Sequence, residues 1–561
     1  MADKITVHCI FIITCILTIY LVLRKPYLYV RLGKRNLKIE SYFFGALLGP
    51  LLIMVFRILD YNQIINGLKG DHGLNPCGIL ILFLSMVFMS VFLDITGFFE
   101  CCARLALKWA GPDGKRLFFA LYITVSLLTI FTSNDIIILT FTPFIYYFAR
   151  NAQLDPKPYL IAEFFAANTW SMMLYIGNPT NILLAAAFGL HFDRYFKWMF
   201  FPTLAAGLVS VFGLFVIFRK SISTPITVNH RNSRESEDPE KAVREDIVRI
   251  VRMSEMAVQE DSERVAQSSV QSVQAIQAIQ AIAPIDPFDA LTDKPGAILG
   301  LVLLGGCIFA LAIAPRLGFE MWTISFAFAF ALLVILMVRD SSAALLRRKG
   351  INGINGLSSL NGKNAEGIKS RKGMESKKGA ENKQGTVAKE DTVANEGTEA
   401  NNRFTVGSTL RKMPWTVVPF VLSLFITVEA LHLYGVTSEV GHFFRSVCGT
   451  SSVAYGLVYG LSSALSANFL NNIPMTVAFV SIIRGLSGRN LLAAALATAA
   501  GSNLGANLTP IGALAGIMWM SILHTKDFHL SFREFVYYGL LITPLTLIAC
   551  LGVLALELAV L

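Results

Sequence analysis

Residues 501–512 read GSNLGANLTPIG, and they interrupt an apolar segment that extends from residue 490 to residue 524. Glycine, asparagine, threonine and proline crowd into this stretch, and such residues break an apolar helix instead of extending it. In lipid every backbone N–H and C=O needs a partner, so a break survives only inside protein or beside water. The stretch therefore predicts a membrane helix that is broken around a polar site.

The first half of the chain carries the same interruptions in the same order. In each half an asparagine is followed nine residues later by a glycine: Asn168 and Gly177, then Asn503 and Gly512. The segment before it is also interrupted, by SND at 133–135 in the first half and by NNIP at 471–474 in the second. Four matched breaks at similar separations indicate an internal repeat.

The composition of the whole chain excludes a soluble protein. Of 561 residues, 54% are hydrophobic and only 15% are charged, against about 25% charged in a typical soluble domain. The net charge is +10, but most basic residues lie between apolar segments, so membrane topology explains them better than nucleic acid does. Eight cysteines without a C-x-x-C spacing indicate neither a disulfide framework nor a metal site.

The apolar segments fall into two sets of six. They lie at 5–23, 42–59, 78–99, 117–149, 158–190 and 198–218, and then at 296–315, 320–338, 414–434, 453–484, 490–524 and 536–560. The fourth segment of each set is predicted to be a re-entrant hairpin, and the fifth to be a broken helix that crosses. Each half then crosses five times, which inverts the second half relative to the first. We therefore expect an all-α polytopic membrane protein with two inverted repeats, about ten transmembrane helices and two re-entrant hairpins.

Basic residues favour one orientation, because Lys and Arg accumulate in cytoplasmic loops. The predicted cytoplasmic loops contain Arg24, Lys25, Arg31, Lys34, Arg35, Lys38, Arg104, Lys108, Lys115, Arg116, Arg150 and Lys157. Both termini are then expected outside. Segment 5–23 could instead be a signal peptide, but it lacks a clear small-residue cleavage site.

Two polar stretches divide the chain further. The predicted parts are a first membrane repeat at 1–218, a linker at 219–294, the first two helices of the second repeat at 295–339, a loop at 340–412, and the rest of that repeat at 413–561. Both polar stretches hold too few apolar residues to offset the entropy of ordering, so we expect them to be disordered and cytoplasmic. A short amphipathic helix at 241–282 and a regulatory or partner-binding role are the alternatives.

The broken helices supply the expected substrate site. A break at mid-membrane exposes N–H groups that attract anions or polar oxygens, and carbonyls that attract cations. Amide and hydroxyl side chains add donors and acceptors without the cost of a buried charge. The expected substrate-binding residues are Ser133, Asn134, Asn168, Gly177, Asn178, Thr180, Asn181, Asn471, Asn472, Asn503, Asn507, Thr509 and Gly512. Kinks and helix contacts are the structural alternative for the same residues.

Ionisable residues within membrane segments are candidates for ion coupling. Asp135, beside Asn134, is predicted to bind the coupling ion, a proton or sodium, with helix capping as its alternative role. Glu163 is expected closer to the cytoplasmic surface. Glu429 and His432 lie one turn apart near the predicted outer end of their helix, where a solvated or structural pair is favoured over a proton relay.

Four stretches carry a resemblance to a known family. They are GSNLGANLTPIGALA at 501–515 with the following Met518-Trp519, NNIP at 471–474, SND at 133–135, and Thr142-Pro143. In these stretches the chain resembles the arsenite permease family of the ion transporter superfamily. The resemblance implies an inverted-repeat transporter whose hairpin tips face the substrate, with relatives that handle arsenite or antimonite, sodium and protons, or carboxylates. Many relatives have Gly-Asp-Pro-Pro-Asn where this chain has GNPTN at 177–181, so a carboxylate suited to cation or proton binding is missing there.

Together, residues and resemblance predict a secondary active transporter of a small inorganic ion or metalloid that works by alternating access. Proton-coupled efflux of arsenite or antimonite is the preferred function. The alternatives are a sodium- or proton-coupled carrier of anions such as dicarboxylates, and a sodium/proton antiporter. A channel is a rival class.

An enzyme is disfavoured, because the eight histidines are scattered and no H-E-x-x-H or G-x-S-x-G motif occurs. We expect no cofactor, no metal site and no nucleic-acid partner. The expected location is multi-pass in the plasma membrane or an intracellular membrane, in contact with membrane lipid. A homodimer is left open.

Overall fold

Two units make up the computed structural model: residues 1–329 with 413–561, and residues 330–412. The structure describes residues 2–24, 27–32, 35–69, 75–110, 113–152, 154–223, 287–348, 406–526, 528 and 530–560. Most of both predicted polar stretches, including the helix considered at 241–282, lies outside the described residues.

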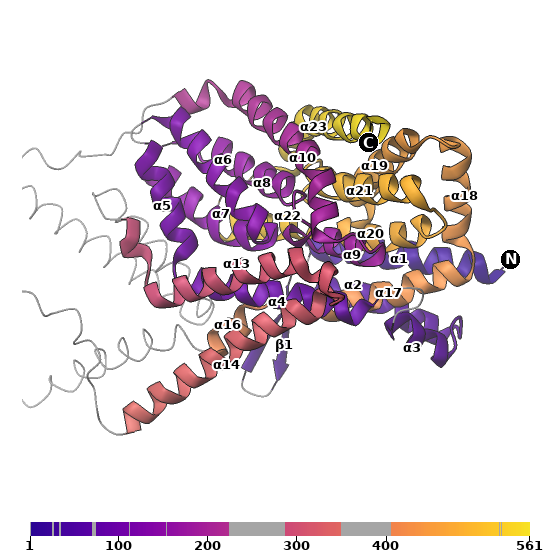
Figure 1. Ribbon diagram of the computed structural model, residues 1–561, viewed down its shortest axis with the longest axis horizontal. Helices are drawn as coiled ribbons and strands as arrows, with labels where there is room; N and C mark the ends of the chain where they lie inside the picture. The colour runs from indigo at the N-terminus through magenta and orange to yellow at the C-terminus, as the bar shows by residue number, and fades with distance from the viewer. Residues whose placement is uncertain are drawn as a thin grey trace, which may run out of the picture. The chain divides into compact units, whose positions relative to one another are not determined.

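The first half runs mainly through helices (Figure 1). Its elements are α1 (Ala2–Arg24), β1 (Tyr27–Leu32), β2 (Arg35–Glu40), α2 (Tyr42–Val55), α3 (Tyr61–Lys69), α4 (Pro76–Ile95), α5 (Phe98–Ala110), α6 (Gly114–Phe131), α7 (Asn134–Asn151), α8 (Lys157–Trp170), η1 (Tyr175–Gly177), α9 (Pro179–Ala187), α10 (Phe192–Phe218) and η2 (Ser221–Ser223).

The second half repeats this order from α17 onward. Its elements are η4 (Pro287–Ala290), α13 (Lys294–Leu317), α14 (Met321–Arg348), α16 (Val406–Lys412), α17 (Val417–Leu433), α18 (Val436–Cys448), α19 (Ser452–Leu470), α20 (Asn472–Ile483), α21 (Gly488–Gly505), α22 (Leu514–Thr525) and α23 (Phe532–Val560). Helix α14 runs to Arg348, past the predicted end of its segment at 339, and α16 lies within the stretch predicted as a loop.

The chain is a multi-pass membrane protein. Its described residues contain eight helices long and apolar enough to cross a membrane, or nine if α16 and α17 count as one bent span. The broken helices fall outside this count because α8, α9 and α22 have only 14, 9 and 12 residues, and α21, with 18, is not apolar enough. Ten crossings, the re-entrant hairpins and the inverted orientation of the second half therefore stay predictions.

One departure from an all-α fold is a β-hairpin after α1. Strands β1 and β2 pair in antiparallel register from Tyr27 opposite Glu40 to Leu32 opposite Arg35. Their sequences, YLYVRL and RNLKIE, alternate apolar with polar or aromatic residues, and a period of two favours strands. Sequence analysis treated these residues only as a basic loop, and that prediction was wrong about their structure.

Elements of the two halves interlock. Helix α2 packs against α17 of the second half, and α13 of the second half packs against α4 of the first. Contacts between the halves also occur at the breaks, where α7 packs against α22 and α20 packs against α9. Helices α10 and α23, which end the two halves, also pack together (Figure 1). The interrupted segments of both halves therefore face one another.

An amphipathic helix of 13 residues precedes the first interrupted segment in each half, as α5 and α18. Helix α5 contacts α7, and α18 contacts α20. Both expose large apolar side chains, with Trp109 66% and Phe443 64% exposed. Aromatic side chains on an amphipathic helix suit the membrane interface. Sequence analysis missed both helices because their mixed polar and apolar composition resembles that of the polar segments that flank membrane spans.

Candidate functional site

The helices break at the four predicted places. Between α6 and α7 lie residues 132–133, and between α8 and α9 lie residues 171–178. The second half matches, with residue 471 between α19 and α20 and residues 506–513 between α21 and α22. Helices α6 and α7 contact each other across their break, as do α19 and α20.

Local chemistry explains why helices restart where they do. The Asn178 side chain caps α9 by accepting hydrogen bonds from the backbone N–H and the hydroxyl of Thr180, at 3.1 and 3.0 Å. Pro179 then occupies the first turn, where its missing N–H costs nothing. Asn471 has φ of +70° and ψ of 152°, a strained backbone conformation for any residue with a side chain. Such strain is concentrated at functional sites.

A cluster of buried amides joins the two halves around Asn503. The Asn503 Oδ1 accepts hydrogen bonds from the Ser171 hydroxyl at 2.8 Å and from the Asn178 amide at 2.9 Å. Its Nδ2 donates to Asn181 Oδ1 at 2.6 Å and to the Ala499 carbonyl at 2.7 Å. One side chain of α21 thus organises the whole break between α8 and α9.

A second chain of amides starts at the first hairpin. Asn134 Nδ2 donates to Asn168 Oδ1, and Asn168 Nδ2 donates to Asn507 Oδ1, both at 3.0 Å. Asn507 Nδ2 is buried and has no hydrogen-bond partner. The chain links α7, α8 and the break after α21, and it ends in an unused donor.

The second hairpin contacts the break in its own half. Asn471 Nδ2 donates to the Ile511 carbonyl at 3.1 Å, and the Asn472 N–H donates to the Gly512 carbonyl at 2.9 Å. Thr509 donates its hydroxyl proton to Asn468 Oδ1 at 2.6 Å. Asn468 was not among the predicted site residues, although it lies three residues before Asn471. Sequence reasoning assigned Asn468 to the break but not to the site, and it did not name Ser171.

Three of the predicted binding residues each have a buried polar atom without a partner: Ser133 Oγ, Asn472 Oδ1 and Asn507 Nδ2. They come from the first hairpin, the second hairpin and the second broken helix. Unpaired buried polar atoms are costly, and they point to a ligand or water that completes them. Donors and acceptors without a fixed cation suit a small neutral or weakly charged molecule that carries hydroxyl groups.

Glycines 177 and 512 pack against the chain itself. A Cβ at Gly177 would lie 2.3 Å from the Ser171 carbonyl oxygen, and one at Gly512 would lie 2.8 Å from Asn468 Oδ1. The obstacle at Gly177 is backbone of the same break, so that position requires glycine. At Gly512 the nearest atom belongs to a side chain of α19, which can shift.

Asp135 lies in the first turn of α7 and is partly exposed. Its backbone N–H donates to Asn134 Oδ1 at 2.9 Å. The N-cap of α7 is Ser133, so the capping role considered for Asp135 is wrong. Asp135 therefore directly follows Asn134, the first member of the amide chain, and does not cap α7.

The other ionisable residues lie in different surroundings. Glu163 is only 1% exposed and accepts a hydrogen bond from the Thr142 hydroxyl at 2.8 Å, while its expected position near the cytoplasmic surface stays a prediction. The His432 ring lies 3.3 Å from the Thr437 hydroxyl on the next helix. Among described residues no cluster of three His, Cys, Asp or Glu side chains could hold a metal ion.

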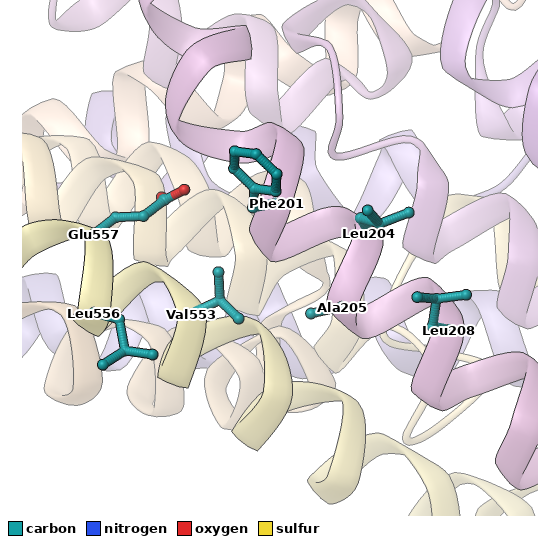
Figure 2. Close-up of a pocket in the computed structure, with 7 residues that line it drawn as sticks. All are labelled: Phe201, Leu204, Ala205, Leu208, Val553, Leu556 and Glu557. Atoms are coloured by element: carbon teal, nitrogen blue, oxygen red, sulfur yellow. The ribbon is translucent and has the colours of Figure 1, made fainter.

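A groove elsewhere on the protein lies between α10 and α23 (Figure 2). Its volume is about 380 Å³, and it is lined by Phe201, Leu204, Ala205, Leu208, Val553, Leu556 and Glu557. These walls are almost wholly apolar, and none of the residues predicted to bind substrate lines them. The groove is therefore separate from the amide site, by which we mean the buried cluster around Asn503 and the chain formed by Asn134, Asn168 and Asn507.

Comparisons with known proteins cover most of the chain. A family model described as citrate transporter matches residues 41–348, and one described as arsenical pump membrane protein matches residues 397–558. An arsenical pump membrane protein of Escherichia coli is 22% identical over 486 residues, which cover 85% of this chain and 86% of that protein.

Two further proteins share shorter or weaker similarity. A silicon efflux transporter of Oryza sativa subsp. japonica is 29% identical over 164 residues, 29% of this chain and 32% of that protein. The solved structure of the Alcanivorax borkumensis YdaH transporter aligns with 99% of this chain and 98% of its own, at 11% identity and a TM-score of 0.41.

Proposed function

This chain belongs to the arsenite permease family of the ion transporter superfamily, and on that premise we propose that it is a secondary active transporter of a small hydroxylated metalloid. Arsenite or antimonite efflux in exchange for protons is the specific function proposed. Membership supports transport of an ion or metalloid in general. The preference for arsenite or antimonite among these substrates rests on the chemistry of the amide site.

The observation that supports the proposal most strongly is that residues of both halves form the site. Asn503 of the second half hydrogen-bonds to Ser171, Asn178 and Asn181 of the first, and Asn507 receives the amide chain from Asn134 and Asn168. A site built from both halves changes when the halves move, which is what alternating access requires.

The chemistry of the site favours a neutral cargo. Arsenite near neutral pH is a trihydroxide, which both donates and accepts hydrogen bonds. The unpaired Ser133 hydroxyl, Asn507 amide and Asn472 carbonyl offer the complementary donors and acceptors. None of the predicted binding residues is cationic, so a fully ionised anion would depend on helix N-termini alone.

Coupling is assigned to Asp135. A carboxylate beside the site can lose its proton when water reaches it from one side and regain it from the other. Exchange of that proton would drive the cargo outward as the hairpin-bearing units move against the surrounding helices. Assembly as a homodimer is compatible with this cycle.

The alternative is a carrier of dicarboxylates or related anions, coupled to sodium or protons. The citrate transporter model over residues 41–348 supports it, and the helix N-termini at the four breaks would face carboxylate groups. A sodium/proton antiporter is a third option within the same family. For both, Asp135 would remain the coupling residue.

Purified protein in proteoliposomes distinguishes these functions. Uptake of arsenite, citrate and sodium would be measured with an imposed pH gradient, with the gradient collapsed by a protonophore, and in empty liposomes. The proposal expects saturable arsenite movement that follows the pH gradient, with citrate and sodium at background. Saturable citrate movement would favour the alternative, whereas arsenite flux that neither saturates nor follows the gradient would favour a channel.

A further inference from the structure

Glu163 is the most deeply buried carboxyl group beside the amide site, and the proposed mechanism does not use it. It lies in the middle of α8, about 9 Å along the helix axis from Lys157 and about 7.5 Å from Asn168. Its side chain is 1% exposed. It therefore sits between the predicted cytoplasmic end of α8 and the amide site.

Helices of both halves surround this carboxyl group. The Thr142 hydroxyl of α7 donates to Glu163 Oε1 at 2.8 Å. The indole nitrogen of Trp519 on α22 and Glu163 Oε2 are both buried without a hydrogen-bond partner. The ring centroid of the neighbouring Phe164 lies 5.2 Å from that of Trp519, with the rings tilted, and 5.2 Å from that of Phe535 of α23, edge to face.

No cationic side chain of the described residues forms an ion pair with Glu163. Four phenols on α8 and the helices around it donate to backbone carbonyls: Tyr122 to Gly207, Tyr146 to Lys526, Tyr159 to Gly114 and Tyr195 to Met172. At the end of α8, Lys157 pairs with Glu534 at 2.6 Å, and Arg150 donates to the Tyr146 hydroxyl. His524 on α22 is exposed.

An ionised carboxylate without a cation is unfavourable in such a place, whereas a protonated carboxyl group has no charge to bury, and its Oε1 already accepts from Thr142. A donor that could serve the ionised form, the unpartnered Trp519 N–H, is carried by α22. If α22 approached α8, the Trp519 N–H would reach Oε2, and the carboxylate would then accept two hydrogen bonds.

We propose that Glu163 is a second proton-binding site, whose occupancy is tied to the position of α22 relative to α7 and α8. This inference rests on the proposed transport function and adds a proton site to it. The O–H bond on Oε2 breaks when α22 closes, and the proton passes to water on the predicted cytoplasmic side. Opening of α22 removes the indole donor, and the carboxylate takes a proton back.

The first test is spectroscopic and needs no cargo. Infrared difference spectra of purified wild type and Glu163→Gln, taken across a pH titration, isolate the C=O stretching band of this carboxylic acid. We expect a band that disappears in Glu163→Gln and persists in Glu429→Gln, a matched acid-to-amide change on α17. Absence of a protonated band that belongs to Glu163 at neutral pH would overturn the proposal.

A second variant separates proton binding from simple packing. Trp519→Phe keeps an aromatic ring beside Phe164 but removes the N–H that would stabilise the carboxylate. Loss of the Glu163 proton should then move to higher pH, because a donor to the charged form is gone. An unchanged infrared titration in Trp519→Phe would contradict the role given to α22.

Transport assays complete the test. Glu163→Gln mimics the protonated form, so substrate counterflow should stay within about twofold of wild type while pH-gradient-driven accumulation falls by about tenfold or more. Gradient-driven accumulation equal to wild type would overturn the proposal. If monodisperse Glu163→Gln lost both counterflow and gradient-driven accumulation, the proposal would also be overturned, and Glu163 would have a structural role. Wild type without gradient-driven transport would instead refute the proposed function, and the infrared result would still decide the proton site.

Discussion

Asn503 and Asn181 are 322 residues apart in the chain, and their side-chain amides meet at 2.6 Å in the protein interior. Asn503 belongs to the helix that breaks in the second half, and Asn181 to the helix that restarts in the first. Neither break is complete without the other. A movement of one half against the other must therefore rearrange this contact.

Replacing Asn503 with alanine should destabilise the protein and stop transport. The change removes four hydrogen bonds and leaves Asn178 Nδ2 and Asn181 Oδ1 unpaired, whereas the Ser171 hydroxyl keeps its bond to the Asn168 carbonyl. Leaving buried polar groups unpaired costs about 1–3 kcal/mol each, so we expect a loss of at least about 2 kcal/mol. Thermal unfolding in detergent measures it, with the exposed Asn62→Ala on α3 as the control. Equal melting temperatures for the two variants would contradict this role of Asn503.

Gly177→Ala should be far more damaging than Gly305→Ala. A Cβ at Gly177 would meet the Ser171 carbonyl at 2.3 Å, whereas a Cβ at Gly305 would have nothing within 4 Å. Overpacking typically costs about 1–3 kcal/mol, and here the obstacle is backbone that cannot swing aside. Comparison of the two melting temperatures checks this. A tolerated Gly177→Ala would show that the break between α8 and α9 is looser than the structure indicates.

Asp135→Asn should uncouple transport from protons. Asparagine keeps the size of the side chain and the start of α7, but it cannot release a proton. Counterflow of arsenite should persist, while accumulation driven by a pH gradient should fall by about tenfold or more. If accumulation in proteoliposomes were unchanged, the coupling proton would not be carried by Asp135.

The ion pair between Lys157 and Glu534 predicts a specific dependence of stability on pH. The hydrogen bond with Glu534 raises the pKa of Lys157 above its usual value near 10.5. A raised lysine pKa stabilises the folded state at all pH values below the unfolded pKa, and this contribution is lost as pH rises through the folded pKa. Lys157→Met should therefore lower the free energy of unfolding by less than about 1 kcal/mol. This loss should stay constant from roughly pH 6 to 9, within the error of measurement.

Melting temperatures of wild type and Lys157→Met across that range test the prediction. Their difference should vanish only in strongly alkaline buffer. A difference that changes steadily between neutral pH and pH 9 would mean that another group controls the titration.

Sequence reasoning located the four breaks because their causes are local. Proline removes an N–H, asparagine caps or adopts a positive φ, and glycine permits close packing, so GNPTN at 177–181 and NNIP at 471–474 mark their own breaks. The sequence did not predict which side chains form hydrogen bonds with each other at the breaks. Which amide meets Asn503 depends on how α9 and α21 pack, and no spacing within either half encodes that contact.

The features that the sequence did not reveal have similar physical causes. The burial of Glu163 depends on neighbouring helices such as α7, whose Thr142 donates to it, and spacing along α8 does not encode that contact. Helices α5 and α18 carry charges on one face, so hydropathy alone could not separate them from loops. The β-hairpin after α1 was hidden by the basic residues that indicated topology.

The central claim is that the breaks of both halves form one substrate site, and transport by hairpin variants tests it most directly. Arsenite movement driven by a pH gradient would be measured in proteoliposomes that contain wild type, Asn134→Ala, Asn471→Ala or Asn62→Ala at equal protein density. We predict that both hairpin variants lose about nine-tenths or more of the wild-type rate, while Asn62→Ala retains it. Wild-type rates in both Asn134→Ala and Asn471→Ala would contradict the claim.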